Sequence, residues 1–311
     1  MRTWIAGVAL VVAPLLALAQ TTLQYRWKQG EPVAYETNLK TDSTMSGMPG
    51  AGDVTLGQTM TQRVRLLPAA VAPDGTTTLQ QTIEAVKVEM TTPMGKAAYD
   101  SAVPQATPDE SSAPLATVFG GIVGATLSVT VAPDGAVQRI DGVQKALDKI
   151  VQNLPPQQRA SAQAAQTLRA VLSEGAIRSS LEQSFPRLPS QSVKPGESWT
   201  AQVSLGSEAT GRIAGTQTLT LKSIEGDVAT IDVALALKQE SSPPMGPSGM
   251  TMKLGDSHGS GTLTFDVAAG RIRSASMITE LASTMTASGP DGRPTTIKNT
   301  TRISMTMEEI K

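Results

Sequence analysis

The pentapeptide Gly255-Asp256-Ser257-His258-Gly259 has the spacing of a hydrolase nucleophile turn, with a serine between two glycines. Such a serine must stand between a strand and a helix, so that a strained turn exposes its hydroxyl. Here the residues that follow, 260–267, alternate as a strand does. His258 is the only histidine of the chain, and as the immediate neighbour of Ser257 it is badly placed to act as its base. We therefore interpret the segment as a polar turn and expect no catalytic residue and no enzymatic activity.

Metal chemistry is limited by the same residue counts. With one histidine and no cysteine, a zinc site built on these ligands is excluded, and we expect no cofactor. Thioethers are the remaining soft ligands, because they suit Cu(I). Flexible methionines also line or cover apolar surfaces, and we favour that role over a metal site. The methionines concerned lie in Gly/Pro-rich segments that we expect to be loops: Met45, Met48, Met245, Met250 and Met252.

The start of the chain has the pattern of a secretory signal peptide. Arg2 precedes an apolar run from Trp4 to Leu18, and Ala17-Leu18-Ala19 forms a small-residue cleavage site. We expect residues 1–19 to be removed and the mature protein to be periplasmic or secreted. The run is short for a transmembrane helix, so we expect no stable membrane span after cleavage. Without cysteine, neither a disulfide nor a lipid-modified cysteine can form.

Charge disfavours nucleic acid as a partner. Removing Arg2 leaves 25 of the 26 basic residues against 27 acidic ones, a nearly neutral protein. Neither a cluster of lysines and arginines nor a set of aromatic residues for stacking is present.

Four short patterns recur in the same order in two parts of the chain. The first is Lys-x-Gly-Glu beside a tryptophan, at Lys28–Glu31 with Trp27 and at Lys194–Glu197 with Trp199. The others pair residues 61–66 with 216–221, 83–95 with 231–246, and 126–135 with 262–270. Together they indicate an internal duplication. We place the first repeat at residues 20–140 and the second at 187–311.

The repeated patterns are typical of β-hairpins. Apolar and polar residues alternate, and the turns carry Gly226-Asp227, Asp134-Gly135 and Ala269-Gly270. In Lys-x-Gly-Glu the glycine supplies the positive φ that a type II turn needs at its third position. The C-terminal segment predicts a last strand with inward-facing Ile297, Ile303, Met305 and Met307.

Residues 141–186 predict a helical segment between the repeats. Val143, Leu147, Ile150 and Leu154 fall on one helical face. Pro155-Pro156 and Gly175 interrupt the helical pattern, so we expect the apolar stripe to act as a lid over a ligand groove. The predicted fold class is α+β, mainly antiparallel β, with two duplicated β-rich halves bridged by a helical segment.

The Lys-x-Gly-Glu pattern beside Trp27, with the Asp-Gly hairpins after it, resembles a family of exported bacterial proteins of unknown function. The resemblance covers most of the mature chain and implies no activity. By architecture alone, long antiparallel strands with helices against them are also similar to periplasmic lipoprotein carriers, whose open half-barrel holds acyl chains. We favour a non-enzymatic exported protein that binds an apolar or lipid-like ligand on a concave antiparallel sheet. The alternatives are a structural or interaction protein of the cell envelope without a small ligand, and Cu(I) binding by the methionine loops.

Overall fold

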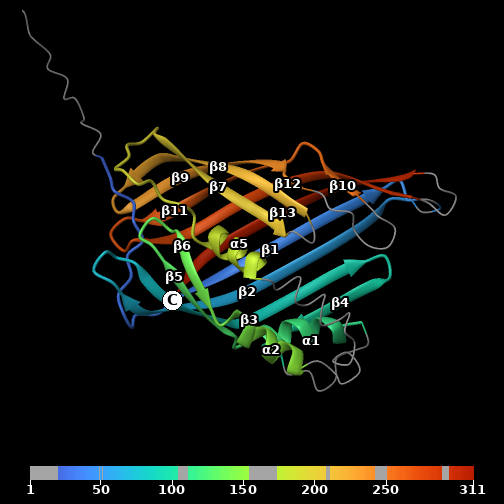
Figure 1. Cartoon of the computed structure of the whole chain (residues 1–311), viewed down its shortest axis with the longest axis horizontal. Helices are drawn as coiled ribbons and strands as arrows, with labels where there is room; N and C mark the ends of the chain where they lie inside the picture. The colour runs from blue at the N-terminus through green and yellow to red at the C-terminus, as the bar shows by residue number, and fades with distance from the viewer. Residues whose placement is uncertain are drawn as a thin grey trace, which may run out of the picture.

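A computed structural model describes residues 20–48, 50, 52–103, 111–153, 174–207, 211–241, 251–288 and 294–311. Within these ranges the strands form one 13-stranded antiparallel sheet, accompanied by three helices (Figure 1). The predicted fold class, mainly antiparallel β with few helices, is confirmed. In the same ranges no helix is both long and apolar enough to cross a membrane.

The elements follow the chain in two groups. The first comprises β1 (Val33–Ser46), β2 (Val54–Val71), β3 (Thr77–Thr92), β4 (Gly95–Asp100), α1 (Ala113–Ile122), β5 (Thr126–Val131) and β6 (Val137–Asp141). Helices α2 (Val143–Asn153) and α5 (Glu174–Ser184) come next. The second comprises β7 (Ser198–Ser207), β8 (Gly211–Glu225), β9 (Val228–Gln239), β10 (Thr251–Leu254), β11 (His258–Asp266), β12 (Arg271–Ser288) and β13 (Pro294–Ile310).

The two groups of strands have the same order in the sheet. The full order is β6-β5-β3-β2-β1-β13-β12-β11-β9-β8-β7. On one side of β13 this order contains β6-β5-β3-β2-β1, and on the other side β12-β11-β9-β8-β7. Each strand of the second set has a number six higher than its counterpart in the first. They differ at their fourth strands, because β4 pairs with β3 whereas β10 pairs with β12. The predicted duplication therefore has a topological counterpart inside one continuous sheet, and the boundaries 20–140 and 187–311 stay predictions.

The repeated Lys-x-Gly-Glu pattern is a turn in both places, as predicted. Gly30 and Gly196 have φ of 81° and 90°. The N–H of Glu31 donates to the carbonyl of Lys28 at 3.1 Å, and that of Glu197 to the carbonyl of Lys194 at 3.0 Å. Each turn is also joined to the second strand of its own group, since the glycine N–H donates to Pro68 in β2 or to Leu221 in β8.

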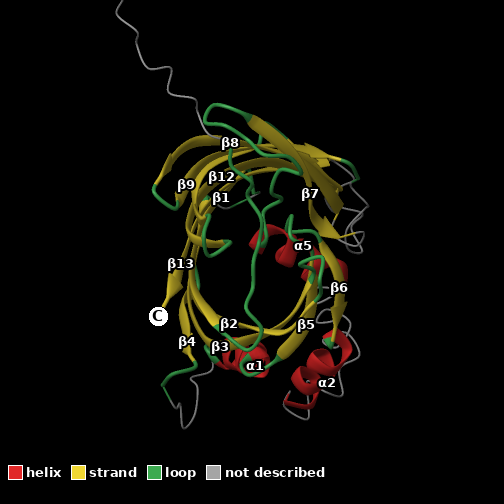
Figure 2. Ribbon diagram, turned by 90° about the vertical axis from the view of Figure 1, so that its left-hand side faces the viewer, coloured by secondary structure: helices red, strands yellow, loops and turns green. Residues whose placement is uncertain are grey.

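The sheet curves strongly, and α5 lies on its concave side between the two edge strands, β6 and β7 (Figure 2). Arg178 of α5 donates to the carbonyl of Val137 in β6 at 3.0 Å, and just after α5 the carbonyl of Arg187 accepts from the indole N–H of Trp199 in β7 at 2.8 Å. The helix and the residues just after it thus connect the two edge strands. Helices α1 and α2 contact each other and lie against β3, β4 and β5.

The core lies at one end of the curved sheet, which we call the closed end. Residues 20–32 cross this end: the N–H of Tyr25 donates to Pro133 at 2.7 Å, and that of Arg26 to Gly270 at 2.8 Å. The ring of Tyr25 makes edge contacts with Phe185 and Phe265, with centroids 5.9 and 5.6 Å apart. Around these rings, further fully buried side chains include Leu23, Leu79, Val129, Leu219, Leu221, Ile231 and Leu263.

The predicted helical segment is present in part. Both α2 and α5 lie inside residues 141–186, and residues 154–173, which contain Leu154 and Pro155-Pro156, are outside the described residues. Helix α1 was not predicted. Its sequence, APLATVFGGI, is apolar almost throughout and has two adjacent glycines. Because both features weaken a helical amphipathic pattern, periodicity gives no signal there.

Candidate ligand-binding trough

One face of the sheet, which we call the inner face, is set by strand alternation and by the position of α5. Tyr35 stands opposite Val64, and Thr37 opposite Met307. These side chains line a small cavity of about 50 Å³ together with Ser184 and the adjoining Phe185 at the end of α5. Since residues directly opposite each other point to the same side, the register assigns every other strand residue to the inner or the outer face.

A continuous apolar row crosses the inner face. Register places its members opposite one another from β3 to β7, and four of them, on β1, β2, β12 and β13, are half-buried. The row runs Val88, Met60, Leu39, Met305, Met277, Gly261, Val233, Leu219 and Trp199. We call the inner face of β1, β2, β12 and β13 the trough.

Methionines are concentrated in and around the trough. Ile297, Ile303, Met305 and Met307 all lie on the inner face, as predicted. Sequence analysis missed the others, because alternation shows which residues share a face but not that separate strands bring them together. They are Met60, Met90, Met277 and Met285.

The predicted methionine loops are wrong for two of their members. Met45 lies in β1 opposite Val54, and Met252 lies in β10 opposite Met285. The register places both on the inner face. These segments are strands and not loops because β1 and β12 extend well past the core, and their threonines and serines are compatible with strand structure. Met48 lies two residues after the end of β1, and Met245 and Met250 are outside the described residues. The premise of Cu(I)-binding loops therefore fails at Met45 and Met252.

Two of the four predicted lid residues line an apolar cleft of about 160 Å³ between α2, α5 and the inner face. Val143 and Leu147 of α2 face Ile177 and Leu181 of α5 across it, and Leu147 is 8% exposed. The side chain of Ile150, like Leu154, is outside the described residues. The remaining lining comes mainly from the sheet: Gln62, Gln81, Ile83, Leu127 and Ile122 at the end of α1.

Two other hollows flank α5. The small closed-end cavity shares Gln81 with the apolar cleft. On the β7 side a wider and more polar cleft of about 490 Å³ is lined by Glu182, Ala201, Val203 and Gln217 among others. Helix α5 therefore stands between an apolar and a polar cleft.

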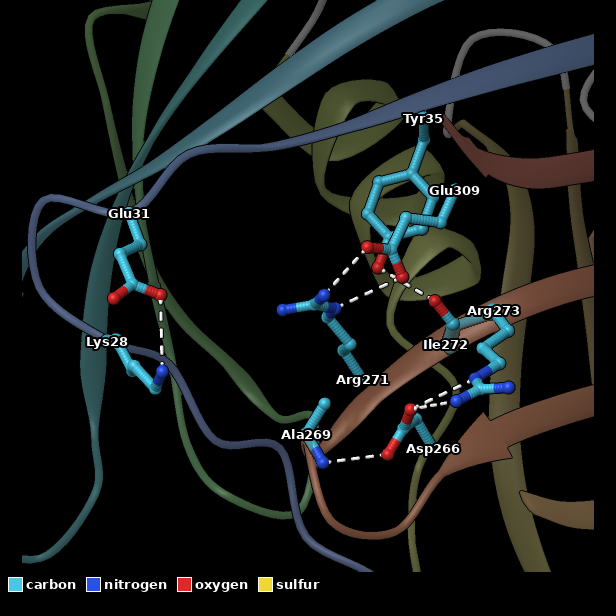
Figure 3. A network of polar contacts seen from close by, with 9 residues as sticks. All are labelled: Lys28, Glu31, Tyr35, Asp266, Ala269, Arg271, Ile272, Arg273 and Glu309. Carbon is cyan, nitrogen blue, oxygen red and sulfur yellow. Dashed lines mark hydrogen bonds and ion pairs between the residues drawn. The ribbon is translucent and has the colours of Figure 1, made fainter. Parts of the chain in front are cut away.

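An ion pair lies at the closed end, beside the apolar surface (Figure 3). Arg271 donates to the carboxylate of Glu309 from Nε at 3.0 Å and approaches it from Nη2 at 2.8 Å. The hydroxyl of Tyr35 donates to the carbonyl of Ile272 at 3.0 Å. Burial raises the pKa of Tyr35 well above its ordinary value, and the charge of Glu309 adds to this. The phenol thus stays a neutral hydrogen-bond donor.

Asp266 is held by neighbours of the β11–β12 turn. Its carboxylate accepts from the backbone N–H of Ala269 at 2.8 Å and from Nε of Arg273 at 2.9 Å. The bond from Ala269 lowers the pKa of Asp266, and Arg273 lowers it further against the opposing effect of burial. Asp266 is 9% exposed as a residue, and its carboxylate stabilises the turn.

The Ser257 segment precedes a strand, as predicted, and therefore does not form a nucleophile turn. The Ser257 hydroxyl is buried and accepts from the N–H of Ala282 at 3.1 Å. His258 begins β11, and its Nε2 lies 3.9 Å from the carboxylate of Glu280 on the neighbouring strand. Within the described part of the chain, no three histidine, aspartate or glutamate side chains are close enough to hold a metal ion.

Comparison with solved structures gives only distant likenesses. DynF, from the dynemicin biosynthesis pathway of Micromonospora chersina, is 10% identical over 97% of this chain and 92% of its own, with a TM-score of 0.20. An outer membrane channel from Pseudomonas putida F1 is 9% identical over 96% of this chain and 100% of its own, with a TM-score of 0.26. Neither superposition is close enough to support an argument about fold or function.

Sequence comparison identifies the family. Comparison with curated proteins found no match. A family model described as "Family of unknown function (DUF6263)" matches residues 74–272, from the turn before β3 to the start of β12. Residues 74–272 are more than half of the 311-residue chain, and the chain therefore belongs to this family of unknown function.

Proposed function

We propose that this protein is an exported, non-enzymatic binding protein whose trough takes up an apolar ligand. The observation that carries the proposal is the apolar row across the inner face, with half-buried Leu39, Met60, Met277 and Met305 at its centre. Methionine side chains adapt to irregular apolar shapes, which suits a surface that accepts a flexible ligand. The apolar cleft beside α2 and α5 extends this surface under the helices.

The outer face has the opposite character. Its strands carry cross-strand and neighbouring ion pairs such as Lys40–Asp42, Lys222–Asp232 and Arg302–Glu280. A sheet that is polar and charged outside and apolar on its concave side favours a water-facing shell around an apolar guest.

Helix α2 is proposed as the lid of this site. Its Val143 and Leu147 cover the cleft, and the cleft meets the inner face at Gln62 of β2. Movement of α2 would widen the entrance while the closed-end core, built from other elements, stays packed.

Two measurements test the binding proposal. Protein purified from the periplasm without detergent is extracted with organic solvent, and mass spectrometry should find a stoichiometric apolar species. Protein freed of that species should enhance the fluorescence of the neutral probe N-phenyl-1-naphthylamine with saturation at one or a few sites. An empty extract together with no saturable probe binding contradicts the proposal and favours the envelope interaction protein, which sedimentation would then show as a complex or oligomer.

A matched pair of substitutions places the site. Met305→Glu puts a charge in the apolar row and should weaken probe binding about 10-fold or more, because the charge has no partner there. Thr306→Glu changes the exposed neighbour on the outer face and should leave binding unchanged. Circular dichroism of both variants confirms folding. Equal probe affinities in the two folded variants would show that the ligand binds outside the trough.

Export is tested separately. When the full chain is produced in a bacterium, mass spectrometry of the exported protein should show a mature chain that begins at Gln20. An intact segment of residues 1–18 in the exported fraction would contradict cleavage after Ala19.

A further inference from the structure

The trough has no charge to offer a ligand. Among the described strand positions of the inner face, Glu309 is the only ionisable group at neutral pH, and Arg271 neutralises it at the closed end. The inner-face positions of β1 are Val33, Tyr35, Thr37, Leu39, Thr41, Ser43 and Met45, and those of β12 are equally free of charge. An ionised head group inside the trough would therefore be desolvated without a partner, which is strongly unfavourable.

The trough does offer neutral hydrogen-bonding groups at several levels, and three of them are joined in one cluster. Ser43 of β1 donates to the amide oxygen of Asn299 in β13 at 2.8 Å and lies 3.0 Å from the hydroxyl of Thr301. The amide nitrogen of Asn299 donates to Thr301 at 3.2 Å. All three are half-buried inner-face residues. Asn299 retains a second N–H and further acceptor capacity, so the cluster can bond to a hydroxyl, ester or amide.

The cluster is placed for a ligand with a long apolar chain. From Met307, beside the closed end, to Thr301, the nearest member of the cluster, the strand extends about 20 Å at ~3.3 Å per residue. Between them lie Met305, with Leu39 and Met277 beside it, and Ile303, with Thr41 and Thr279 beside it. A polar cluster separated from the closed end by this mainly apolar stretch fits an amphiphile whose tail points to the closed end.

Resting on the proposed function, we infer that the ligand is a long-chain amphiphile with an uncharged head, such as a hydroxyl, ester or amide, seated at Ser43, Asn299 and Thr301. Because the described inner-face strand positions offer no unpaired cation, ionised fatty acids and anionic phospholipid heads would be poor ligands. The same described positions offer no unpaired anion, so cationic amphiphiles would be poor ligands for the same reason.

The test uses two probes that differ only in the head, a BODIPY-labelled fatty acid and its glycerol monoester. At neutral pH the monoester should bind about 10-fold or more tightly than the ionised acid, because only the acid carries a charge into the trough. As the pH falls through about 4–5, the acid becomes protonated and its affinity should approach that of the monoester, whose own affinity should stay constant. Equal binding at neutral pH, or tighter binding of the acid, overturns the inference and leaves the proposed function intact. Binding of neither probe, together with no N-phenyl-1-naphthylamine binding, overturns both.

A substitution that adds a positive charge to the trough should reverse the preference between the two probes. Thr301→Lys adds a cation to the inner face next to Ser43 and should reverse the preference, so that the acid binds more tightly than the monoester. Thr300→Lys places the same charge on the exposed outer face of the adjacent position and should keep the wild-type preference. An unchanged preference in a folded Thr301→Lys protein contradicts the assigned head-group position. If that variant does not fold, the pH dependence of the wild type decides.

Discussion

At the scale of single residues, the two turn glycines have the same backbone role. Gly30 and Gly196 both have a left-handed backbone, and no heavy atom lies within 4 Å of where a Cβ would stand at either position. Substitution there adds backbone strain without a packing clash. We expect Gly30→Val and Gly196→Val each to lower the free energy of unfolding by about 1–3 kcal/mol, measured by urea denaturation.

Gly52 is the matched control for these variants. It is equally free of neighbouring atoms but does not have a positive φ. Gly52→Val should therefore change the urea midpoint little. A midpoint that shifts as much for Gly52→Val as for Gly196→Val would show that side-chain bulk, and not backbone conformation, causes the loss.

Asp266 should make the stability depend on acid pH. Because the folded protein lowers the pKa of this carboxyl through Ala269 and Arg273, the ionised form is favoured by folding. The stabilisation is complete above the unfolded value of about 3.9 and is lost as the pH falls from there through the lower folded value. Urea midpoints measured between neutral pH and about pH 2 should fall in the wild type more steeply than in Asp266→Asn, which should already be less stable at neutral pH. Parallel pH profiles of the two proteins would rule out this role.

At the scale of elements, α2 provides the main test of the lid. Leu147 lines the cleft, where water can reach a side chain that moves, whereas Leu219 is fully buried in the core. Leu147→Asp should cost under about 2 kcal/mol and weaken N-phenyl-1-naphthylamine binding, while Leu219→Asp should cost about 4 kcal/mol or more. Thermal and urea unfolding measure the loss of stability in both variants, and fluorescence titration measures the loss of binding in Leu147→Asp.

An exposed residue of the same helix serves as the control. Lys145→Asp should alter neither stability nor binding appreciably, since this side chain points to solvent. A Leu147→Asp protein that is grossly unfolded would show that α2 is a fixed part of the core. A folded Leu147→Asp protein that binds the probe like the wild type would contradict the proposal that α2 is a lid.

The sequence predicted individual elements better than their association. Alternation identified the last strand and its inward Met305 and Met307, and Gly30 and Gly196 marked turns that are present. Alternation did not reveal that Met60, Met277 and Met305 share one row, because that depends on the pairing of β1 with β13 across most of the chain. The apolar stripe with Val143 and Leu147 was predictable because a helical pattern is local, whereas the other cleft residues Ile83 and Leu127 belong to strands distant in the sequence.

At the scale of the whole molecule, the two groups of strands form one structure. Strand β13 pairs with β1 from Ala34↔Ile310 to Ser46↔Lys298 and with β12 from Ser274↔Glu308 to Ser288↔Pro294. The N-terminal Tyr25 packs against Phe185 and Phe265, which belong to the later part of the chain. Loss of either group would therefore open an edge of the other and expose the shared core.

We accordingly expect the protein to unfold in a single cooperative transition. Trp27 and Trp199 are the only tryptophans after residue 19; Trp27 precedes β1 of the first group, and Trp199 lies in β7 of the second. The variant Trp199→Phe reports the first group by fluorescence, and Trp27→Phe reports the second. In each variant the urea transition followed by fluorescence should coincide with that followed by far-ultraviolet circular dichroism, because dichroism records the strands of both groups. Transitions that separate within either variant would mean that the two groups unfold independently, and the continuous sheet would then be held together more weakly than its β1–β13 pairing implies.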